Sequence, residues 1–308
     1  MRIVSLLASA TEMVNDLGAG EWLAGRSHEC DHPAWVRRLP QCSEPAFDIQ
    51  VSSRDIDCEV TRRVRSGEPL YTIHYDRIRE LHPDIIFAQE HCEVCAVTPG
   101  DVRRGRCEFP GTRIVALTAS TVDQIFQSLF EIARAIGLEE RAAAVAAAHR
   151  EKIEGLQSRT ARRRRPTVAV LEWVDPIFAM GNWGPELVEI AGGLPVLGSP
   201  GEYSRAIDPR LLLDANPEYL VIAPCGFDLE RALAEQQVLE QLPWWHKLRA
   251  VEEGKVAFAD GNRYFNRSSL SVVATAEILA EILHGIEAPA SAEKPRWRWY
   301  TDPRVRVL

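Results

Sequence analysis

The stretch that decides the fold is RIVSLLASATEMVNDLGAGEWLAGRSHECDHP, residues 2–33. Within it, RIVSLL (2–7) predicts a buried strand, TEMVNDLGAG (11–20) predicts a helix that ends at glycine, and WLAGRS (22–27) predicts a second strand. A strand, a helix and a strand in this order indicate a parallel pair of strands covered by the helix. This stretch therefore predicts an α/β fold with a parallel sheet.

The same pattern continues along the chain and then starts again. PDIIFAQ (83–89) and TRIVALTA (112–119) predict two further strands, which complete an N-terminal α/β lobe over residues 1–118. PTVAVLEWV (166–174), NPEYLVIAP (216–224) and KVAFAD (255–260) predict the strands of a second α/β lobe, residues 161–290. We therefore expect two lobes with parallel sheets.

A helical segment lies between the two lobes. Residues 119–160 have apolar positions at helical spacing and one central glycine, Gly137, so they predict one long helix or a pair of helices. A last helix is expected over 268–286, and residues 291–308 form a basic and aromatic tail that we expect to pack on the surface.

Composition limits the partners. The chain has 308 residues with a formal net charge of -8, which disfavours binding to nucleic acid. No run of about 18 apolar residues is present, so we expect no membrane insertion.

The first residues already belong to a predicted strand rather than to a signal peptide, and seven cysteines do not suggest a disulfide framework. We expect a cytoplasmic protein as the sequence is written, or a periplasmic one if a signal has been removed.

Two polar clusters follow predicted strands of the first lobe, SHECDHP (27–33) and QEHCEVC (89–95). Ligands gather at the carboxyl ends of parallel strands, so both clusters are candidates for a site. His28, Cys30 and His32 alternate, and an extended backbone would point them the same way. His28, Cys30, Cys92 and Cys95 are candidate metal ligands, while a thiol redox pair and small buried loop residues are the alternatives for the cysteines.

Aromatic residues follow strands of the second lobe. Trp173 ends the strand VAVLEW, and PIFAMGNWGPE (176–186) and NRYFNR (262–267) supply further rings. Large flat side chains at strand ends suit a large, partly apolar ligand. No nucleophile motif and no phosphate-binding loop is visible, so we expect a binding protein rather than an enzyme.

The order of these motifs resembles the class III periplasmic binding proteins that deliver cobalamin and iron-siderophores to ABC importers. The resemblance begins with residues 2–33, continues through YTIHYDRIRELHPDIIFAQ (71–89) and PIFAMGNWGPELVEIAGG (176–193), and ends at FADGNRYFNRSSLSVVATAEILAEIL (258–283). It is closest to the cobalamin-binding branch. Three features differ from that branch: the expected lack of a signal peptide, a longer segment at 52–71, and His91, Cys92 and Cys95 where relatives offer a tryptophan loop.

The resemblance implies two Rossmann-like lobes joined by a long rigid helix, with the ligand in a cleft between the lobes. The ligand contacts that it implies are Ser9, Ala10, Thr11, Ser27, His28, Glu29, Cys30, Asp31, Glu90, His91, Cys92, Trp173, Phe178, Trp183, Tyr264, Phe265 and Arg267.

Three hypotheses of function follow. The first is a non-catalytic binding protein for cobalamin or a related corrinoid or tetrapyrrole, in which His28, His32 or His91 reaches the metal as an axial ligand. The second is a metal-dependent or redox-active protein that uses the His/Cys cluster. The third is an import receptor for an iron-siderophore or haem, with an ABC permease as partner.

Overall fold

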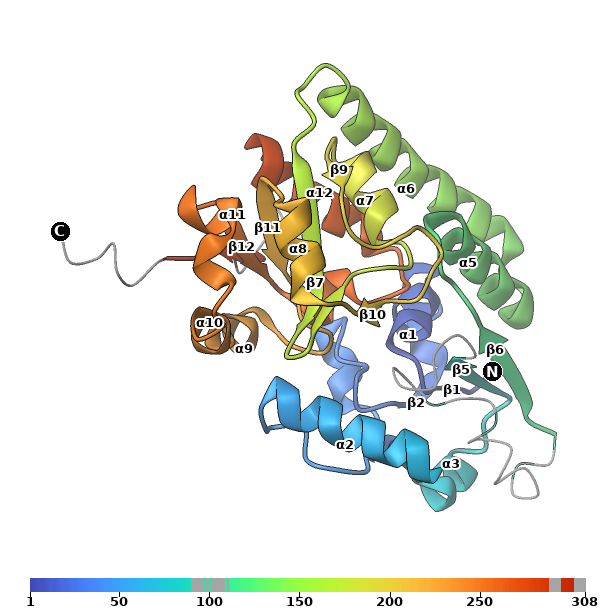
Figure 1. Cartoon of the computed structure of the whole chain (residues 1–308). Coiled ribbons are helices and arrows are strands. Elements are labelled where there is room, and N and C mark those ends of the chain that lie inside the picture. The colour runs from blue at the N-terminus through green and yellow to red at the C-terminus, as the bar shows by residue number, and fades with distance from the viewer. Residues whose placement is uncertain (90–96, 98–99, 101–108, 110, 288–294, 302–308) are drawn as a thin grey trace. The chain divides into compact units, whose positions relative to one another are not determined.

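The computed structural model describes residues 1–89, 97, 100, 109, 111–287 and 295–301 (Figure 1). The chain divides into two compact units. Unit 1 comprises residues 1–119, 123–149 and 268–270, and unit 2 comprises residues 120–122, 150–267 and 271–308. Each unit is described in turn.

Unit 1 is built on a wholly parallel four-stranded sheet with the strand order β2-β1-β5-β6. The opening stretch supplies β1 (Ile3–Ser5), α1 (Ala8–Asp16) and β2 (Leu23–Arg26), as its apolar pattern predicts. The strands β5 (Ile85–Gln89) and β6 (Arg113–Leu117) extend the sheet on the other side of β1. The parallel sheet predicted for this part of the chain is confirmed.

The core of unit 1 lies under this sheet. Val4 and Leu6 from the first strand region pack with Ile86 and Ala88 of β5, and all four are almost fully buried. Ile78, from α3 (Tyr75–Leu81), joins the same cluster and is buried completely. Removing this apolar surface from water is the main stabilising contribution to such a layer.

The long segment before α3 forms a small substructure of its own. The strands β3 (Ser43–Pro45) and β4 (Tyr71–Ile73) pair antiparallel, and α2 (Ser53–Ser66) connects them. The helix begins where the Ser52 hydroxyl accepts a hydrogen bond from a backbone N–H of the first turn, and it ends at Gly67, whose φ of 71° favours glycine.

The connecting segment contains two helices rather than one. α5 (Val122–Ile136) and α6 (Glu139–Thr160) are separated at Gly137, which has a φ of 75° and therefore ends a helix at little cost. α6 has 22 residues, and its residues up to His149 belong to unit 1 while those from Arg150 belong to unit 2. This helix thus carries the chain from one unit into the other.

Unit 2 contains a larger sheet, whose main path has the strand order β10-β8-β7-β11-β12-β13, with β9 pairing alongside β7. Its strands are β7 (Thr167–Val174), β8 (Ile177–Ala179), β9 (Leu194–Pro195), β10 (Arg205–Ala206), β11 (Tyr219–Ile222), β12 (Val256–Ala259) and β13 (Trp297–Trp299).

This second sheet is mixed, which corrects the expectation of a purely parallel one. Its centre, β7-β11-β12, is parallel as predicted, but β8, β10 and β13 run antiparallel to their neighbours. β8 follows β7 after a two-residue turn, and so short a connection permits only an antiparallel return. β13 comes from the C-terminal tail, which thus adds a strand to the sheet of unit 2.

Helices surround the sheet of unit 2. α7 and α12 pack against each other, α9 packs on β12, and α11 packs on β11. α12 begins at Val272 rather than at the predicted residue 268, because residues 269–271 form a bend and turn before it. Within the described residues, no helix is long and apolar enough to cross a membrane. The helices of unit 2 are α7 (Gly184–Ile190), α8 (Pro209–Ala215), α9 (Leu229–Ala234), α10 (Gln236–Glu240), α11 (Arg249–Glu252) and α12 (Val272–His284).

Candidate functional site

The first predicted contacts lie at the start of α1, directly after β1. Ser9, Ala10 and Thr11 occupy the first turn of this helix and expose at most 3% of their surface. The Ser9 hydroxyl accepts a hydrogen bond from the Ser268 hydroxyl at 3.2 Å. These residues therefore form the inner wall of the region at the carboxyl end of β1.

The cluster SHECDHP forms a tight turn instead of the expected extended segment. The backbone N–H of Cys30 donates to the carbonyl of Ser27 at 3.3 Å, and the N–H of Glu29 donates to the Ser27 hydroxyl at 3.2 Å. The expectation that His28, Cys30 and His32 point the same way is therefore wrong. The serine hydroxyl competes for backbone donors and closes a turn, which is a common effect of serine after a strand.

Cys30 is completely buried, and its sulfur already has polar neighbours. The Thr11 hydroxyl donates to the sulfur at 2.9 Å, the Ser27 hydroxyl lies 3.1 Å from it, and the thiol donates to the carbonyl of Ser5 at 3.7 Å. These contacts tie the turn to β1 and α1. They account for a cysteine at this position without a metal.

His28 is the side chain of this turn that is best suited to bind a metal centre. Its Nδ1 lies 3.3 Å from the Ser43 hydroxyl, its ring centre lies 5.2 Å from that of Tyr71, and its Nε2 lies 3.9 Å from the Glu29 carboxylate. Burial, together with the smaller effect of the positive charge of Arg26, lowers the pKa of His28 to about 4. At neutral pH the imidazole is therefore uncharged and can donate electrons to a metal centre.

The other members of the turn are more exposed. Glu29 and Asp31 are partly exposed, and His32 is exposed. Asp31 lies 3.6 Å from the guanidinium of Arg37, a surface ion pair of little energetic weight.

Of the second cluster, QEHCEVC, the structure describes only Gln89. Glu90, His91, Cys92 and Cys95 lie outside the described residues, so their contacts with a ligand or metal stay predictions. Among the described residues, no group of three or more His, Cys, Asp or Glu side chains is arranged to hold a metal ion. The proposed set of His28, Cys30, Cys92 and Cys95 likewise stays a prediction.

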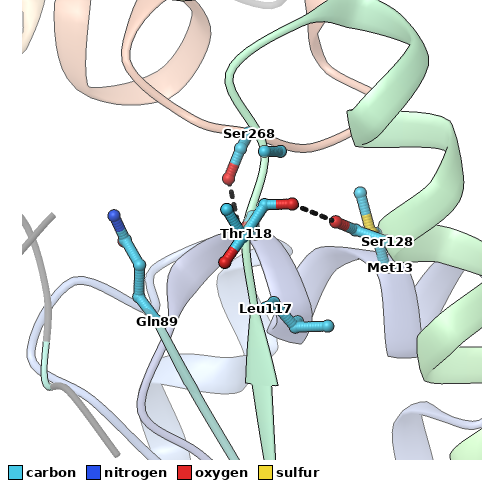
Figure 2. A pocket seen from close by; sticks show the side chains of 8 residues that line it. Met13, Gln89, Leu117, Thr118, Ser128 and Ser268 are labelled. Atoms are coloured by element: carbon cyan, nitrogen blue, oxygen red, sulfur yellow. Dashed lines mark hydrogen bonds between the residues drawn. The ribbon is translucent and has the colours of Figure 1, made fainter. Parts of the chain in front are cut away.

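Unit 1 contains a small hollow at the carboxyl ends of β5 and β6 (Figure 2). Gln89 is the last residue of β5, and Thr118 directly follows β6. One side of the hollow is closed by the bond between Ser268 and Ser9, and another by the Ser128 hydroxyl, which donates to the carbonyl of Thr118 at 3.5 Å. The lining residues are Ser9, Met13, Gln89, Leu117, Thr118, Ala119, Ser128 and Ser268.

Unit 2 has aromatic side chains at the corresponding ends of its strands. Trp173, near the end of β7, is partly exposed and packs on Phe227 with ring centres 5.2 Å apart. The guanidinium of Arg231 lies 4.0 Å from the centre of the Phe227 ring, a favourable cation–π distance. Phe178 of β8 is partly exposed and pairs with Trp173 across the two strands. Trp173 and Phe178 therefore offer partly exposed aromatic surface, while the Phe227 ring that packs on Trp173 is buried.

The remaining predicted contacts of unit 2 are mostly internal. The indole N–H of Trp183 donates to the carbonyl of Phe265 at 3.1 Å, and both side chains are buried. Arg267 is 5% exposed and donates to the backbone carbonyl of Asn262 at 2.7 Å and to its side-chain oxygen at 3.1 Å. These three residues hold the loop after β12, while Tyr264 in the same loop keeps some exposed surface.

Sequence reasoning did not single out Thr118, Phe227 or Arg231, and it included Gln89 only as the first residue of the QEHCEVC cluster, not among the predicted contacts. A signal was present for two of them, because Gln89 is the polar end of the apolar strand IIFAQ, and Phe227 follows the strand YLVIA after a short Pro-Cys-Gly turn. Arg231 is noticed only when its guanidinium is seen over the Phe227 ring.

A family model described as "Periplasmic binding protein" matches residues 3–262 of the chain. No curated protein matches the sequence significantly.

Solved structures share the fold over nearly the whole chain. A periplasmic haem-binding protein from Pseudomonas aeruginosa is 19% identical, with 98% of each chain covered and a TM-score of 0.73. The periplasmic vitamin B12 binding protein of Vibrio cholerae is 18% identical, with 92% of this chain and 96% of that chain covered and a TM-score of 0.64. The periplasmic haem-binding protein of Vibrio cholerae is 16% identical, with 92% and 99% covered and a TM-score of 0.68. At these identities the likeness shows the fold alone.

Proposed function

The chain belongs to the periplasmic binding protein family, and from that premise we propose that it is a non-catalytic binding protein for a tetrapyrrole, with cobalamin or a related corrinoid as the preferred ligand. The family's members bind small-molecule solutes and work with ABC permeases. The proposal adds the class of ligand and the residues that contact it.

The observation that carries this proposal is the aromatic surface of unit 2. Trp173 keeps exposed surface while its ring is held by Phe227, so it offers a rigid flat contact at little entropic cost. Phe178 lies beside it on the neighbouring strand. Rings held in this way match the apolar face of a macrocycle better than they match a small polar solute.

His28 supports a ligand that contains a metal. Its imidazole is uncharged at neutral pH, and the Ser43 hydroxyl fixes one ring nitrogen, so the other is oriented. A neutral imidazole of fixed orientation is a good axial ligand for cobalt or iron. We propose His28 as that ligand, with His32 and His91 as the alternatives.

Haem is the second candidate ligand. The structures similar to this chain include proteins described as binding haem and one described as binding vitamin B12, and both ligands are metal-bearing tetrapyrroles. The His28 arrangement suits iron as well as cobalt, so the ligand's peripheral groups must distinguish them. An iron-siderophore remains a third candidate, which the aromatic surface favours less.

An ABC permease is the proposed protein partner, and the cytoplasmic location expected from the sequence stays a prediction. Cell fractionation tests both statements. Recovery with the periplasmic fraction would contradict the cytoplasmic expectation and strengthen the case for a permease.

Absorption spectroscopy tests the ligand class directly. Freshly purified protein is titrated with cyanocobalamin, aquocobalamin and haemin, and we expect saturable binding of a corrinoid with a dissociation constant below about 10 µM. Aquocobalamin or haemin should show a shifted absorption band when an imidazole binds the metal, and the shift should disappear in His28→Gln. Absence of binding to every corrinoid and to haemin would overturn the proposal.

A further inference from the structure

We propose that the antiparallel pair β3–β4 positions His28 for a metal centre, with Ser43 and Tyr71 as positioning residues that hold the ring so that Nε2 binds the metal. The inference rests on the proposed function, because it assumes a metal-bearing tetrapyrrole as the ligand. It also narrows the class of ligand. A metal whose axial position holds an exchangeable water is preferred to one whose axial position is blocked, as by the cyanide of cyanocobalamin.

The pair β3–β4 is joined to the strand that precedes His28. The backbone N–H of Arg26, the last residue of β2, donates to the carbonyl of Pro40 at 3.0 Å, and the N–H of Cys42 donates to the carbonyl of Arg26 at 2.7 Å. Cys42 directly precedes β3, and its carbonyl accepts from the N–H of His74, directly after β4, at 2.9 Å. The backbone that carries His28 is therefore fixed to the segment that supplies its side-chain partners.

Ser43 is the buried partner of the imidazole. The residue is completely buried, and its hydroxyl lies 3.3 Å from Nδ1 of His28. Among the residues that the structure describes, the imidazole is the only group bonded to this hydroxyl. A hydroxyl can donate to Nδ1 or accept from it, and a buried hydroxyl without a partner is unfavourable, so the bond is kept in either tautomer.

Tyr71 supports the imidazole from β4. The centres of the two rings are 5.2 Å apart and their planes are tilted by 34°, which is ordinary geometry for packed aromatic rings. Tyr71 also packs against the buried core cluster of unit 1. Side chains alternate along a strand, and the neighbouring Thr72 is exposed. The tyrosine therefore connects the imidazole to the core.

These contacts leave Nε2 as the nitrogen that meets a metal. A neutral imidazole binds a metal through the nitrogen that carries no proton, while the other nitrogen donates its proton to a fixed acceptor. The Ser43 hydroxyl is that acceptor at Nδ1. The Glu29 carboxylate lies 3.9 Å from Nε2, too far for a hydrogen bond, and its negative charge favours a cationic metal centre there.

The imidazole can bind a metal only where an axial position accepts a nitrogen. In aquocobalamin the axial water leaves and the lone pair of Nε2 forms the new bond to cobalt, with no change in oxidation state. In cyanocobalamin the cyanide stays on the cobalt. The contribution of His28 should therefore appear with aquocobalamin and not with cyanocobalamin.

The test compares these two corrinoids on the full chain and on the variants Ser43→Ala and Tyr71→Leu. Dissociation constants are measured by absorption titration. Matched controls are Glu44→Gln and Thr72→Val, which change the neighbouring exposed residues of β3 and β4.

We expect the unmodified chain to bind aquocobalamin about tenfold more tightly than cyanocobalamin. Ser43→Ala should weaken aquocobalamin binding about tenfold, as for the hydrogen-bond partner of a metal-bound histidine, and Tyr71→Leu should weaken it about threefold. Neither variant should change the binding of cyanocobalamin, and the controls should bind both corrinoids as the unmodified chain does.

A second measurement does not depend on the folding of Ser43→Ala or Tyr71→Leu. Nitrogen NMR of the histidine-labelled full chain with aquocobalamin shows which ring nitrogen of His28 binds cobalt and which one carries the proton, and His28→Gln assigns the signals. We expect cobalt on Nε2 and the proton on Nδ1. Cobalt on Nδ1 would overturn the inference.

Haemin provides the same test if no corrinoid binds. Its absorption band for a bound imidazole should lose intensity in Ser43→Ala and keep it in Glu44→Gln. An unchanged band in Ser43→Ala would contradict the positioning role.

The inference also fails if Ser43→Ala weakens the binding of both corrinoids equally, which would show a structural role alone, or if the unmodified chain binds both with equal affinity. The proposed function would stand in either case. Absence of binding of any tetrapyrrole to the unmodified chain would instead overturn the proposed function, and the role of Ser43 and Tyr71 in metal binding with it.

Discussion

At the carboxyl ends of its strands, unit 1 carries small polar side chains and one partly buried imidazole, whereas unit 2 carries aromatic rings and an arginine. In unit 1 the typical contact is a hydroxyl bonded to another hydroxyl or to a sulfur, as between Ser268 and Ser9 or between Thr11 and Cys30. In unit 2 it is a ring packed on a ring or under a guanidinium, as at Phe227.

The difference suggests a division of labour in ligand binding. Rings bury apolar area, and their contribution to affinity depends little on direction. Hydroxyl, amide and imidazole groups have directed partners, and a ligand that fails to match them leaves a buried polar group unpaired. We therefore expect unit 2 to supply most of the affinity and unit 1 most of the selectivity.

Trp173→Ala tests whether unit 2 supplies most of the affinity, and it should have the largest effect on ligand binding. Removing the ring takes away the exposed face of the aromatic surface, so tetrapyrrole binding should weaken by about 2–4 kcal/mol, as for an aromatic hot spot. The measurement is a titration followed by absorption, with circular dichroism to confirm folding.

The matched control for this variant is Trp299→Ala on β13, whose ring is 42% exposed and which pairs with the start of β12 rather than its end. If Trp299→Ala weakens binding as much as Trp173→Ala does, the aromatic surface at the strand ends is not the ligand surface.

The burial of His28 in unit 1 is tested by the pH dependence of the free energy of unfolding. Its pKa is about 4 in the folded chain and 6.5 without the fold's influence, so between these values the unfolded chain binds a proton that the folded chain does not. Stability should therefore fall as the pH is lowered from 6.5 to 4, by an amount on the order of 3 kcal/mol at its limit.

Urea unfolding at pH 7 and at pH 4.5 measures this loss, and His28→Gln should lose less stability between the two pH values than the unmodified chain. Identical pH dependence in both proteins would show that the imidazole is not buried as the structure has it.

Cys30→Ala separates a structural cysteine from a metal ligand. The Thr11 and Ser27 hydroxyls would lose their sulfur neighbour in a buried place, so we expect a loss of about 1–2 kcal/mol in the free energy of unfolding. The exposed Cys58→Ala on α2 is the control and should leave stability unchanged. Elemental analysis of untagged protein completes the test, since a metal lost only in Cys30→Ala would favour the metal hypothesis.

Arg231→Met should have the smallest effect. The guanidinium holds the Phe227 ring from one side, and such a contact contributes about 0.5–1 kcal/mol at a partly exposed site. We expect tetrapyrrole affinity to fall about two- to fivefold, measured by the same titration as for Trp173→Ala. A much larger loss for an anionic ligand than for cyanocobalamin would show that Arg231 contacts the ligand directly.

Local pattern was sufficient for much of the fold. The apolar runs of residues 2–27 predicted β1, α1 and β2 because their spacing matches that of a strand, a helix and a strand. Gly137 marked the break between α5 and α6, since only glycine adopts its backbone conformation readily. The resemblance in motif order extended this prediction to the family, which the match over residues 3–262 bears out.

The candidate site could be predicted only in outline. The sequence placed His28 and Trp173 at strand ends, and the structure finds both there with partly accessible surface. It gave no sign that Cys30 is enclosed by two hydroxyls, because those hydroxyls come from α1 and from the preceding turn.

By itself, then, the sequence determined the class of fold, the parallel centre of each sheet and the strand ends that carry chemistry, since these depend on periodicity and on residues close together in the chain. Tertiary structure decided the antiparallel edges of the second sheet, the turn at Ser27 and the hollow in which Ser9, Gln89, Thr118 and Ser268 meet. Strand direction and the sharing of hydrogen bonds are settled between segments far apart in the chain, so no local pattern contains them.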